Sequence, residues 1–253
     1  MIRTLTPADF DAVYEAFLDA FSDYVVKLSP TREQLTEMLT RRGYVPEMSI
    51  GMFDEGRLVA FTLNGVEPDR AYDSGTGVVI SHRRRGLARQ VMNACFEVLG
   101  DRPYVLEVID SNTPAIELYR GLGFEETRGL QCWILESHSL TVSQSHSEAL
   151  PVRLCDCETL RPSWQNSSAS IARARDEHVT ISDDHGEVVL FPNTGDLAQL
   201  RGRVSTALLG AALERAGKPL RIMNIDEGER GVAEFLEAAG AVKLVRQLEM
   251  LRG

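Results

Sequence analysis

Apolar and polar residues in the first half of the chain switch repeatedly between helical and extended spacing. The expected helices are residues 7–21, with Thr6 as N-cap before Pro7, and residues 31–41, with Ser29 or Thr31 as N-cap. The expected strands are residues 49–53 and 58–63, joined as a β-hairpin by the turn 54–56, and residues 75–80. A helix, a strand and a second helix follow. This order predicts a mixed α/β fold.

The pattern recurs 117 residues further along the chain, which predicts an internal duplication. Each copy has one helix, then a strand, then a second helix that ends at a glycine. The matched positions are Val105-Leu106 with Ile222-Met223; Leu87, Val91, Met92 and Cys95 with Val204, Leu208, Leu209 and Ala212; and Ala115, Leu118, Tyr119, Leu122 and Gly123 with Val232, Phe235, Leu236, Ala239 and Gly240. A serine-rich segment at 137–149 is typical of an exposed linker. We therefore expect two domains, residues 1–136 and 150–253.

Composition limits the classes of function. The chain is 43% hydrophobic and 25% charged, as in ordinary globular proteins, and its net charge of −10 disfavours binding to nucleic acid. No run approaches the ~20 apolar residues that a membrane-spanning helix needs, and no secretory signal begins the chain. Four cysteines, Cys95, Cys132, Cys155 and Cys157, are too few and too irregular for a disulfide framework. Cys155 and Cys157 are too close together for a zinc-finger pair, and no second pair follows them. These features predict a cytoplasmic protein with no metal.

The most informative segment follows the predicted strand 75–80, where a short basic loop leads into a helix at or just after Gly86. The first amides of a helix have no partner within it, and they stabilise phosphate groups well. Gly86 and Ala88 leave the backbone open to a ligand. The basic residues are Arg83, Arg84, Arg85 and Arg89. Arginines at a helix N-terminus oppose the helix dipole, so this cluster favours an anionic ligand over a purely structural role.

Two motifs carry a resemblance to a known family. Arg83-Arg-Arg-Gly-Leu-Ala88 resembles the Q/R-x-x-G-x-G/A signature of the GNAT superfamily of N-acetyltransferases. Leu106-Glu-Val-Ile-Asp-Ser-Asn112, followed by Ala115, Leu118-Tyr119 and Gly123-Phe124, is similar to the second hallmark of that family. The resemblance covers residues 1 to about 136. It implies a mixed, splayed sheet flanked by helices, acetyl-CoA as the donor, and a small-molecule or peptide amine as the acceptor.

The resemblance also implies roles for single residues. The backbone of Thr76, Gly77 and Val78 is expected along the pantetheine arm, with one amide, that of Val78, facing the thioester oxygen. The cofactor-binding segment is Arg83, Arg84, Arg85, Gly86, Leu87, Ala88 and Arg89, whose amides from Arg84 onward are expected to hold the pyrophosphate. Asn112 is expected to contact the pantetheine or the far end of the cofactor. Tyr119 matches the tyrosine that protonates the departing thiolate, and Glu107 matches a strand glutamate that acts as general base.

Alternatives remain open at this stage. Asp73 is a second candidate for the general base, because several members of the family place theirs on that strand. Tyr119 lies on the apolar face of its predicted helix, which is also typical of a core tyrosine. Gly75-Thr-Gly77 predicts a bulge or a close backbone approach rather than a nucleotide loop.

In the second half, the residues matched to Gly86, Asn112 and Tyr119 are Arg203, Glu229 and Leu236. We expect this half to be a degenerate GNAT-like domain that binds no CoA and completes a substrate cleft, forms a homodimer surface or buries a hydrophobic face. The chain as a whole is expected to be an N-acetyltransferase that acts in a ternary complex. The alternative is a non-catalytic acyl-CoA-binding module whose second domain binds a partner protein.

Overall fold

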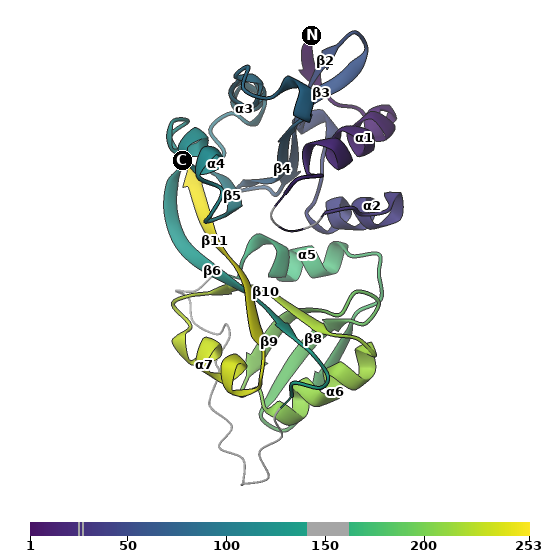
Figure 1. The fold of residues 1–253 in the computed structure, drawn as a ribbon, viewed down its shortest axis with the longest axis vertical. Helices are drawn as coiled ribbons and strands as arrows, with labels where there is room; N and C mark the ends of the chain where they lie inside the picture. Colours follow the sequence, from purple (N-terminus) through teal and green to yellow (C-terminus); the bar gives the residue numbers. More distant parts are fainter. Residues whose placement is uncertain (25, 27, 141–161) are drawn as a thin grey trace. The chain divides into compact units, whose positions relative to one another are not determined.

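The computed structural model describes residues 1–24, 26, 28–140 and 162–253 (Figure 1). Its contacts divide the chain into two compact units. Unit 1 comprises Met1–Glu107, Asn112–Glu126 and Met250–Gly253, and unit 2 comprises Val108–Ser111 and Thr127–Glu249. This grouping assigns residues 127–136 to unit 2, whereas the sequence places a domain boundary at residue 136. The linker beyond residue 140, with Cys155 and Cys157, lies outside the described residues.

Unit 1 is a mixed sheet with helices on both faces. Its strands, in sheet order, are β1 (Ile2–Thr4), β2 (Ile50–Asp54), β3 (Arg57–Val66), β4 (Ala71–Val78) and the first part of β5 (Tyr104–Ile109). The pairs from β1 to β4 are antiparallel, and β4 and β5 are parallel. Its helices are η1 (Pro7–Asp9), α1 (Phe10–Ala20), α2 (Arg32–Arg41), η2 (Pro46–Met48), η3 (Ile80–His82), α3 (Leu87–Leu99) and α4 (Thr113–Arg120). Helices α1 and α2 lie on one side of this sheet, and α3 and α4 lie on the other (Figure 1).

Local chemistry explains where several of these elements begin. The hydroxyl of Thr31 accepts a hydrogen bond from the amide of Gln34, and the Gln34 side chain accepts one from the amide of Thr31, so α2 starts with a capping box. The hairpin turn has Glu55 at φ +47° and Gly56 at φ +82°, the left-handed pair that a two-residue turn between β2 and β3 requires. Both features confirm the predicted elements.

Unit 2 repeats the same layout. Its sheet order is β11 (Val242–Arg252), β6 (Glu125–Leu135), β10 (Leu220–Asp226), β9 (Asp196–Gly202), β8 (Gly186–Phe191) and β7 (Val179–Ser182). Its helices are η4 (Trp164–Asn166), α5 (Ser168–Arg173), α6 (Thr206–Ala216) and α7 (Arg230–Ala238). Strand β11 has the same span as β6, shifted by 117 residues. Adjacent β9 and β10 are parallel, like β4 and β5.

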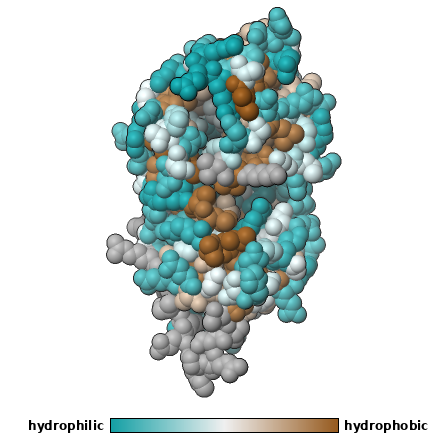
Figure 2. All heavy atoms as spheres, viewed as in Figure 1, coloured by the Kyte–Doolittle hydropathy of each residue, from teal (hydrophilic) through white to brown (hydrophobic). Residues whose placement is uncertain are grey.

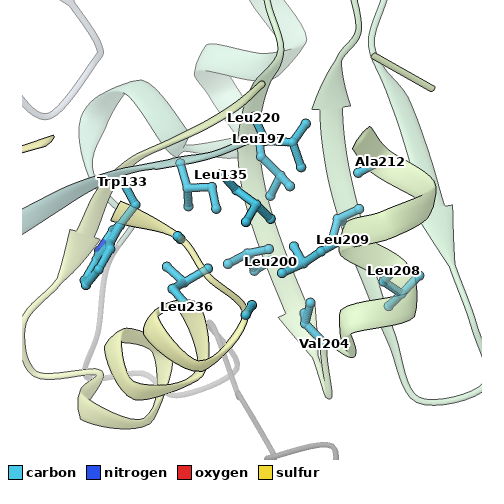
Figure 3. Close-up of a cluster of buried hydrophobic side chains, with 14 of the residues drawn as sticks. Trp133, Leu135, Leu197, Leu200, Val204, Leu208, Leu209, Ala212, Leu220 and Leu236 are labelled. Atoms are coloured by element: carbon cyan, nitrogen blue, oxygen red, sulfur yellow. The ribbon is translucent and has the colours of Figure 1, made fainter. Parts of the chain in front are cut away.

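The core of unit 2 lies between its sheet and helices α6 and α7 (Figure 3). The labelled side chains that fill it are Trp133, Leu135, Leu197, Leu200, Val204, Leu208, Leu209, Ala212, Leu220 and Leu236. The predicted apolar helix positions Val204, Leu208, Leu209 and Ala212 are therefore core residues. On the face drawn in Figure 2, hydrophilic residues cover most of the described surface, with smaller apolar patches between them.

Candidate active site

The loop between β4 and α3 offers a row of backbone donors. Gly86 is the N-cap of α3, with φ +73°, and no side chain caps the helix. The first hydrogen bond of the helix runs from the amide of Gln90 to the carbonyl of Gly86, 3.2 Å away. No acceptor within the described part of the chain pairs with the backbone amides of residues 84–89. This segment can therefore donate several hydrogen bonds to an anion.

The arginines of this loop do not act as one group. The Arg83 guanidinium forms two bonds with the Asp23 carboxylate, at 2.7 and 2.8 Å, and a third with the carbonyl of Ala20 at 2.9 Å. Arg89 donates to the carbonyl of Gly121 at 2.9 Å, so it ties α3 to the end of α4. Arg84 and Arg85 are exposed on the loop. Only the last two present their charge at the surface of the loop itself.

A bulge in β4 brings two predicted site residues to one face. Gly75 pairs with Leu63 and Asp73 pairs with Asn64, so Ser74 is an extra residue on β4. Without the bulge, Asp73 and Thr76 would point to opposite faces; here the Thr76 hydroxyl donates to Asp73 Oδ2 at 2.7 Å. The amide of Gly75 donates to Asp73 Oδ1 at 2.9 Å. The predicted bulge near Gly75-Thr-Gly77 is thus present.

Close packing against β4 explains why residue 77 is a glycine. A Cβ at Gly77 would lie 2.5 Å from Cζ of Phe61 and 3.0 Å from Cβ of Ala20, so α1 and β3 approach the strand too closely for a side chain. Strands β4 and β5 pair only at Ala71 with Tyr104 and at Tyr72 with Val105. Beyond that point no strand pairing between them is present in the described residues, and the β5-facing edge of residues 76–78 is open to a ligand.

Asp73 is a buried carboxyl with a shifted pKa. Its exposed fraction is 7%. Burial raises the pKa of Asp73 to about 6, and the hydrogen bonds from Thr76 and Gly75 offset part of that rise. Tyr119, Tyr104 and Cys95 face it from α4, β5 and α3. Asp73 therefore carries its charge at neutral pH, but at a cost in free energy.

Replacing Asp73 with asparagine is expected to change how stability depends on pH. Because its folded-state pKa lies above the unfolded value, its contribution to stability is full below about pH 4 and is lost as the pH rises through about 6. The free energy of unfolding of Asp73→Asn, relative to the wild type, should therefore increase by about 3 kcal/mol between pH 4 and pH 7.5. Urea denaturation at the two pH values measures this difference. A difference that is the same at both would contradict the shifted pKa.

Tyr119 lies beside Asp73 and Thr76, with its ring packed against Phe124 at 5.7 Å between centroids. Its exposed fraction is 8%. Burial and the negative charge of Asp73 raise the pKa of Tyr119 well above 10. The hydroxyl thus stays protonated at neutral pH and is available as a donor. Asn112, at the start of the same helix, accepts a hydrogen bond from the amide of Ala115 at 3.4 Å and acts as the N-cap of α4.

Glu107 occupies the opposite side of the diverging strands. The Tyr72 hydroxyl donates to Glu107 Oε2 at 3.0 Å, and Glu107 is half-buried. Neighbouring residues on a strand point to opposite faces, so Tyr72 and Glu107 lie on the face of α1 and α2. Asp73 lies on the face of α3, where Thr76 also contacts Sδ of Met92 at 3.4 Å. The two candidate bases are therefore on opposite faces of the sheet.

Comparison with known proteins places this site in a family. Residues 10–124 match the family described as Acetyltransferase (GNAT) family. The chain contains a GNAT acetyltransferase domain. All predicted site residues fall within the matched segment. No curated protein matches the chain.

Two solved structures with a TM-score of 0.71 have a similar fold over all of this chain. A proposed acetyltransferase from Pyrococcus horikoshii has a TM-score of 0.71 and 15% identity, covering 100% of this chain and 89% of its own. A GCN5-related N-acetyltransferase from Sphaerobacter thermophilus has a TM-score of 0.71 and 12% identity, covering 100% and 95%. The ribosomal-protein-S18-alanine N-acetyltransferase of Escherichia coli is 26% identical over 56% of this chain and 84% of its own, with a TM-score of 0.43.

Three residues of the GNAT domain were not singled out from the sequence. Arg42, after α2, donates to the carbonyl of Ser74 at 2.7 Å and so gives the extra residue of the bulge a hydrogen-bond partner. Tyr72 holds Glu107, and Tyr24 lies near enough to Tyr119 to contribute to its raised pKa.

No group of three or more His, Cys, Asp or Glu side chains among the described residues is arranged to hold a metal ion. None of the helices in the same part of the chain has the length and apolar character needed to cross a membrane.

Proposed function

We propose that the GNAT domain transfers an acetyl group from acetyl-CoA to a primary amine by direct attack in a ternary complex. GNAT acetyltransferases use acetyl-CoA, and the loop before α3 fits its diphosphate. The observation that carries this proposal is the row of unpaired amides at residues 84–89, next to a left-handed Gly86 that leaves the backbone uncovered. The thioester end would then lie along residues 76–78, at the edge of β4 that β5 leaves open.

The side chains around that edge supply the remaining chemistry. An alkyl ammonium must lose a proton before it can attack, and we assign this step to Glu107. Its side chain shares the face of α1 and α2, on which we expect the acceptor amine to bind. Asp73 is less suited, because both its oxygens accept hydrogen bonds and it is buried on the other face. An amide of the Gly77–Val78 segment would donate to the oxyanion, and Tyr119 would protonate the departing thiolate.

A thiol-release assay tests this function directly. Acetyl-CoA is offered with a panel of amines: a polyamine, an aminoglycoside, peptides with free N-termini and a lysine peptide. We expect release of CoA that depends on at least one amine, with the acetylated product identified by mass spectrometry. Binding of acetyl-CoA without release on any amine would instead support the non-catalytic acyl-CoA-binding module.

We further propose that unit 2 is a degenerate GNAT-like domain without a CoA site. Only three residues separate β9 from α6, and Ser205 Oγ caps the helix by accepting from the amide of Leu208 at 3.2 Å. The side chain of Asn166 donates to the carbonyl of Met223 on β10 at 2.7 Å. Its own carbonyl accepts from Gln199 on β9 at 2.6 Å, so Asn166 bridges the two parallel strands. Ser205 thus occupies one of the first amides of α6, and Asn166 links β9 to β10, two features that disfavour a cofactor there.

Calorimetric titration with acetyl-CoA is therefore expected to give one site per chain. A variant of the loop in unit 1, Gly86→Val, should lose that site, because a β-branched residue is strained at φ +73° and covers the helix N-terminus. Substitution of Ser205 with alanine in unit 2 should leave the stoichiometry and affinity unchanged. Two sites per chain, or one site that survives Gly86→Val, would contradict the assignment.

A further inference from the structure

The side chain of Arg83 ties the loop before α3 to the end of α1. Besides its two bonds to Asp23 and one to Ala20, its Nε donates to the carbonyl of Val78 at 3.3 Å. A second link runs beside it, since the amide of Ile80 donates to Asp19 Oδ1 at 2.7 Å. The Arg83 and Asp23 side chains are 36% and 56% exposed. A guanidinium that binds the diphosphate would be expected to have its N–H groups available to the ligand. The N–H groups of Arg83 instead donate to other residues of the protein.

The segment to which Arg83 is bonded lies near the part of the site where the acetyl transfer is proposed to take place. We call Phe21–Tyr24, which follows α1, the α1 turn. The Phe21 ring packs against β4, where a Cβ at Gly75 would be 3.9 Å from its Cζ. The rings of Phe21 and Tyr24 meet edge to face at 5.4 Å. Tyr24 is near enough to Tyr119 for its charge to contribute to the raised pKa of Tyr119. The α1 turn thus packs against β4 at Gly75, next to residues 76–78, along which the thioester is proposed to lie.

We propose that Arg83 is a positioning residue that couples the diphosphate loop to the α1 turn, so that cofactor bound at residues 84–89 fixes Tyr24 beside Tyr119 for the acceptor. This inference rests on the proposed function. Its physical basis is shared ordering: an anion on the amides restricts the loop, and the Arg83–Asp23 pair passes that restriction to the turn. An exposed ion pair adds little to global stability, so we assign the Arg83–Asp23 pair a role in coupling rather than in folding. Coupling of this kind is reciprocal, and acceptor bound at the turn should tighten cofactor binding.

Hydrogen exchange with coenzyme A as the probe tests the coupling without an acceptor. The reporters in the turn are the amides of Ser22 and Tyr24, which bond to the carbonyls of Asp19 and Phe21 at 3.2 Å each. In the wild type, saturating coenzyme A should slow exchange both at residues 84–90 and in the turn, the latter about fivefold. In Asp23→Asn, residues 84–90 should still be slowed, and the turn should change less than about twofold.

The matched control is Asp11→Asn, which breaks the ion pair of Asp11 with Arg32 at the other end of α1. It should behave as the wild type. Steady-state kinetics with the best amine of the panel give a second readout: Asp23→Asn should lower kcat/KM for the amine about tenfold, with the Kd for acetyl-CoA within about twofold. Arg83→Lys keeps the positive charge but loses the paired N–H groups of the guanidinium, and it should show the same loss of kcat/KM with an unchanged Kd for acetyl-CoA. This variant replaces Asp23→Asn if Asp23→Asn does not fold.

Two results would overturn the inference while leaving the function intact. One is a turn that coenzyme A protects equally in the wild type and in Asp23→Asn. The other is an Asp23→Asn variant that loses affinity for acetyl-CoA as much as it loses turnover, which would make the pair part of the cofactor site. If coenzyme A does not slow exchange at residues 84–90 in the wild type, the proposed function itself fails, and the inference with it.

Discussion

Replacing Tyr119 with phenylalanine is expected to lower kcat about 100-fold or more, while the Kd for acetyl-CoA changes less than about twofold. The substitution keeps the ring that packs against Phe124, so the fold around α4 should be unaffected. It removes only the hydroxyl, which remains protonated at neutral pH because burial and Asp73 raise its pKa. The thiolate would then leave without a proton donor. Stopped-flow or steady-state thiol release, together with calorimetry for the cofactor, measures the two quantities separately.

The chain offers a matched control for this change. Tyr104 is also buried and faces Asp73, but its hydroxyl is bonded within the core, to Asn64 and Thr62. Tyr104→Phe should cost about 1 kcal/mol of unfolding free energy and leave kcat within about threefold of the wild type. If Tyr119→Phe behaves in the same way, Tyr119 is a core tyrosine and another group protonates the thiolate.

Features encoded by neighbouring residues could be predicted from the sequence. The capping box at Thr31 and Gln34, the hairpin turn at Glu55 and Gly56, and the helix start at Gly86 each depend on residues a few positions apart. Their backbone requirements are specific, since few residue types cap a helix or adopt a left-handed conformation without strain. For the same reason the GNAT resemblance could rest on two short motifs.

Features that depend on distant residues could not be predicted. Nothing near Arg83 in the sequence indicates that its guanidinium pairs with the carboxylate of Asp23, 60 residues earlier. Nor does the sequence indicate that Arg42 donates to the carbonyl of Ser74 in the bulge of β4, because the two residues meet only when α2 is folded onto the sheet. The sequence thus predicted the local elements around the candidate site, but not which of its charged side chains pair with other residues of the protein.

The boundary between the two halves is another long-range feature. The last four residues, Met250–Gly253, belong to unit 1, and Arg252 lies over the Phe96 ring at 4.1 Å. The domain boundary predicted at the serine-rich linker was based on composition. The two units of the structure are instead defined by contacts, which depend on strand pairing, and a strand at the end of a chain can pair within either unit. The division into a catalytic and a degenerate domain stays a prediction, and the single-site titration addresses it.

The choice of general base leads to the second large effect. Glu107→Gln is expected to lower kcat/KM for the amine by about 100- to 1,000-fold at pH 7.5, because the amide cannot take the proton from the acceptor. The side chain keeps an oxygen that can accept from Tyr72, so the local structure and the affinity for acetyl-CoA should be retained. Asp73→Asn should lower the same quantity less than about tenfold, since its carboxyl lies on the other face of the sheet.

A pH profile separates the loss of a base from mere distortion. Without Glu107, the reaction would depend on amine that is already neutral in solution, and that fraction rises about tenfold per pH unit below the pKa of the amine. The deficit of Glu107→Gln should therefore shrink steadily as the pH is raised from 7 to 9.5. A distorted site would keep the same deficit at every pH. If instead Asp73→Asn shows the large loss and the recovery at high pH, the proton of the acceptor passes to Asp73, on the face of α3.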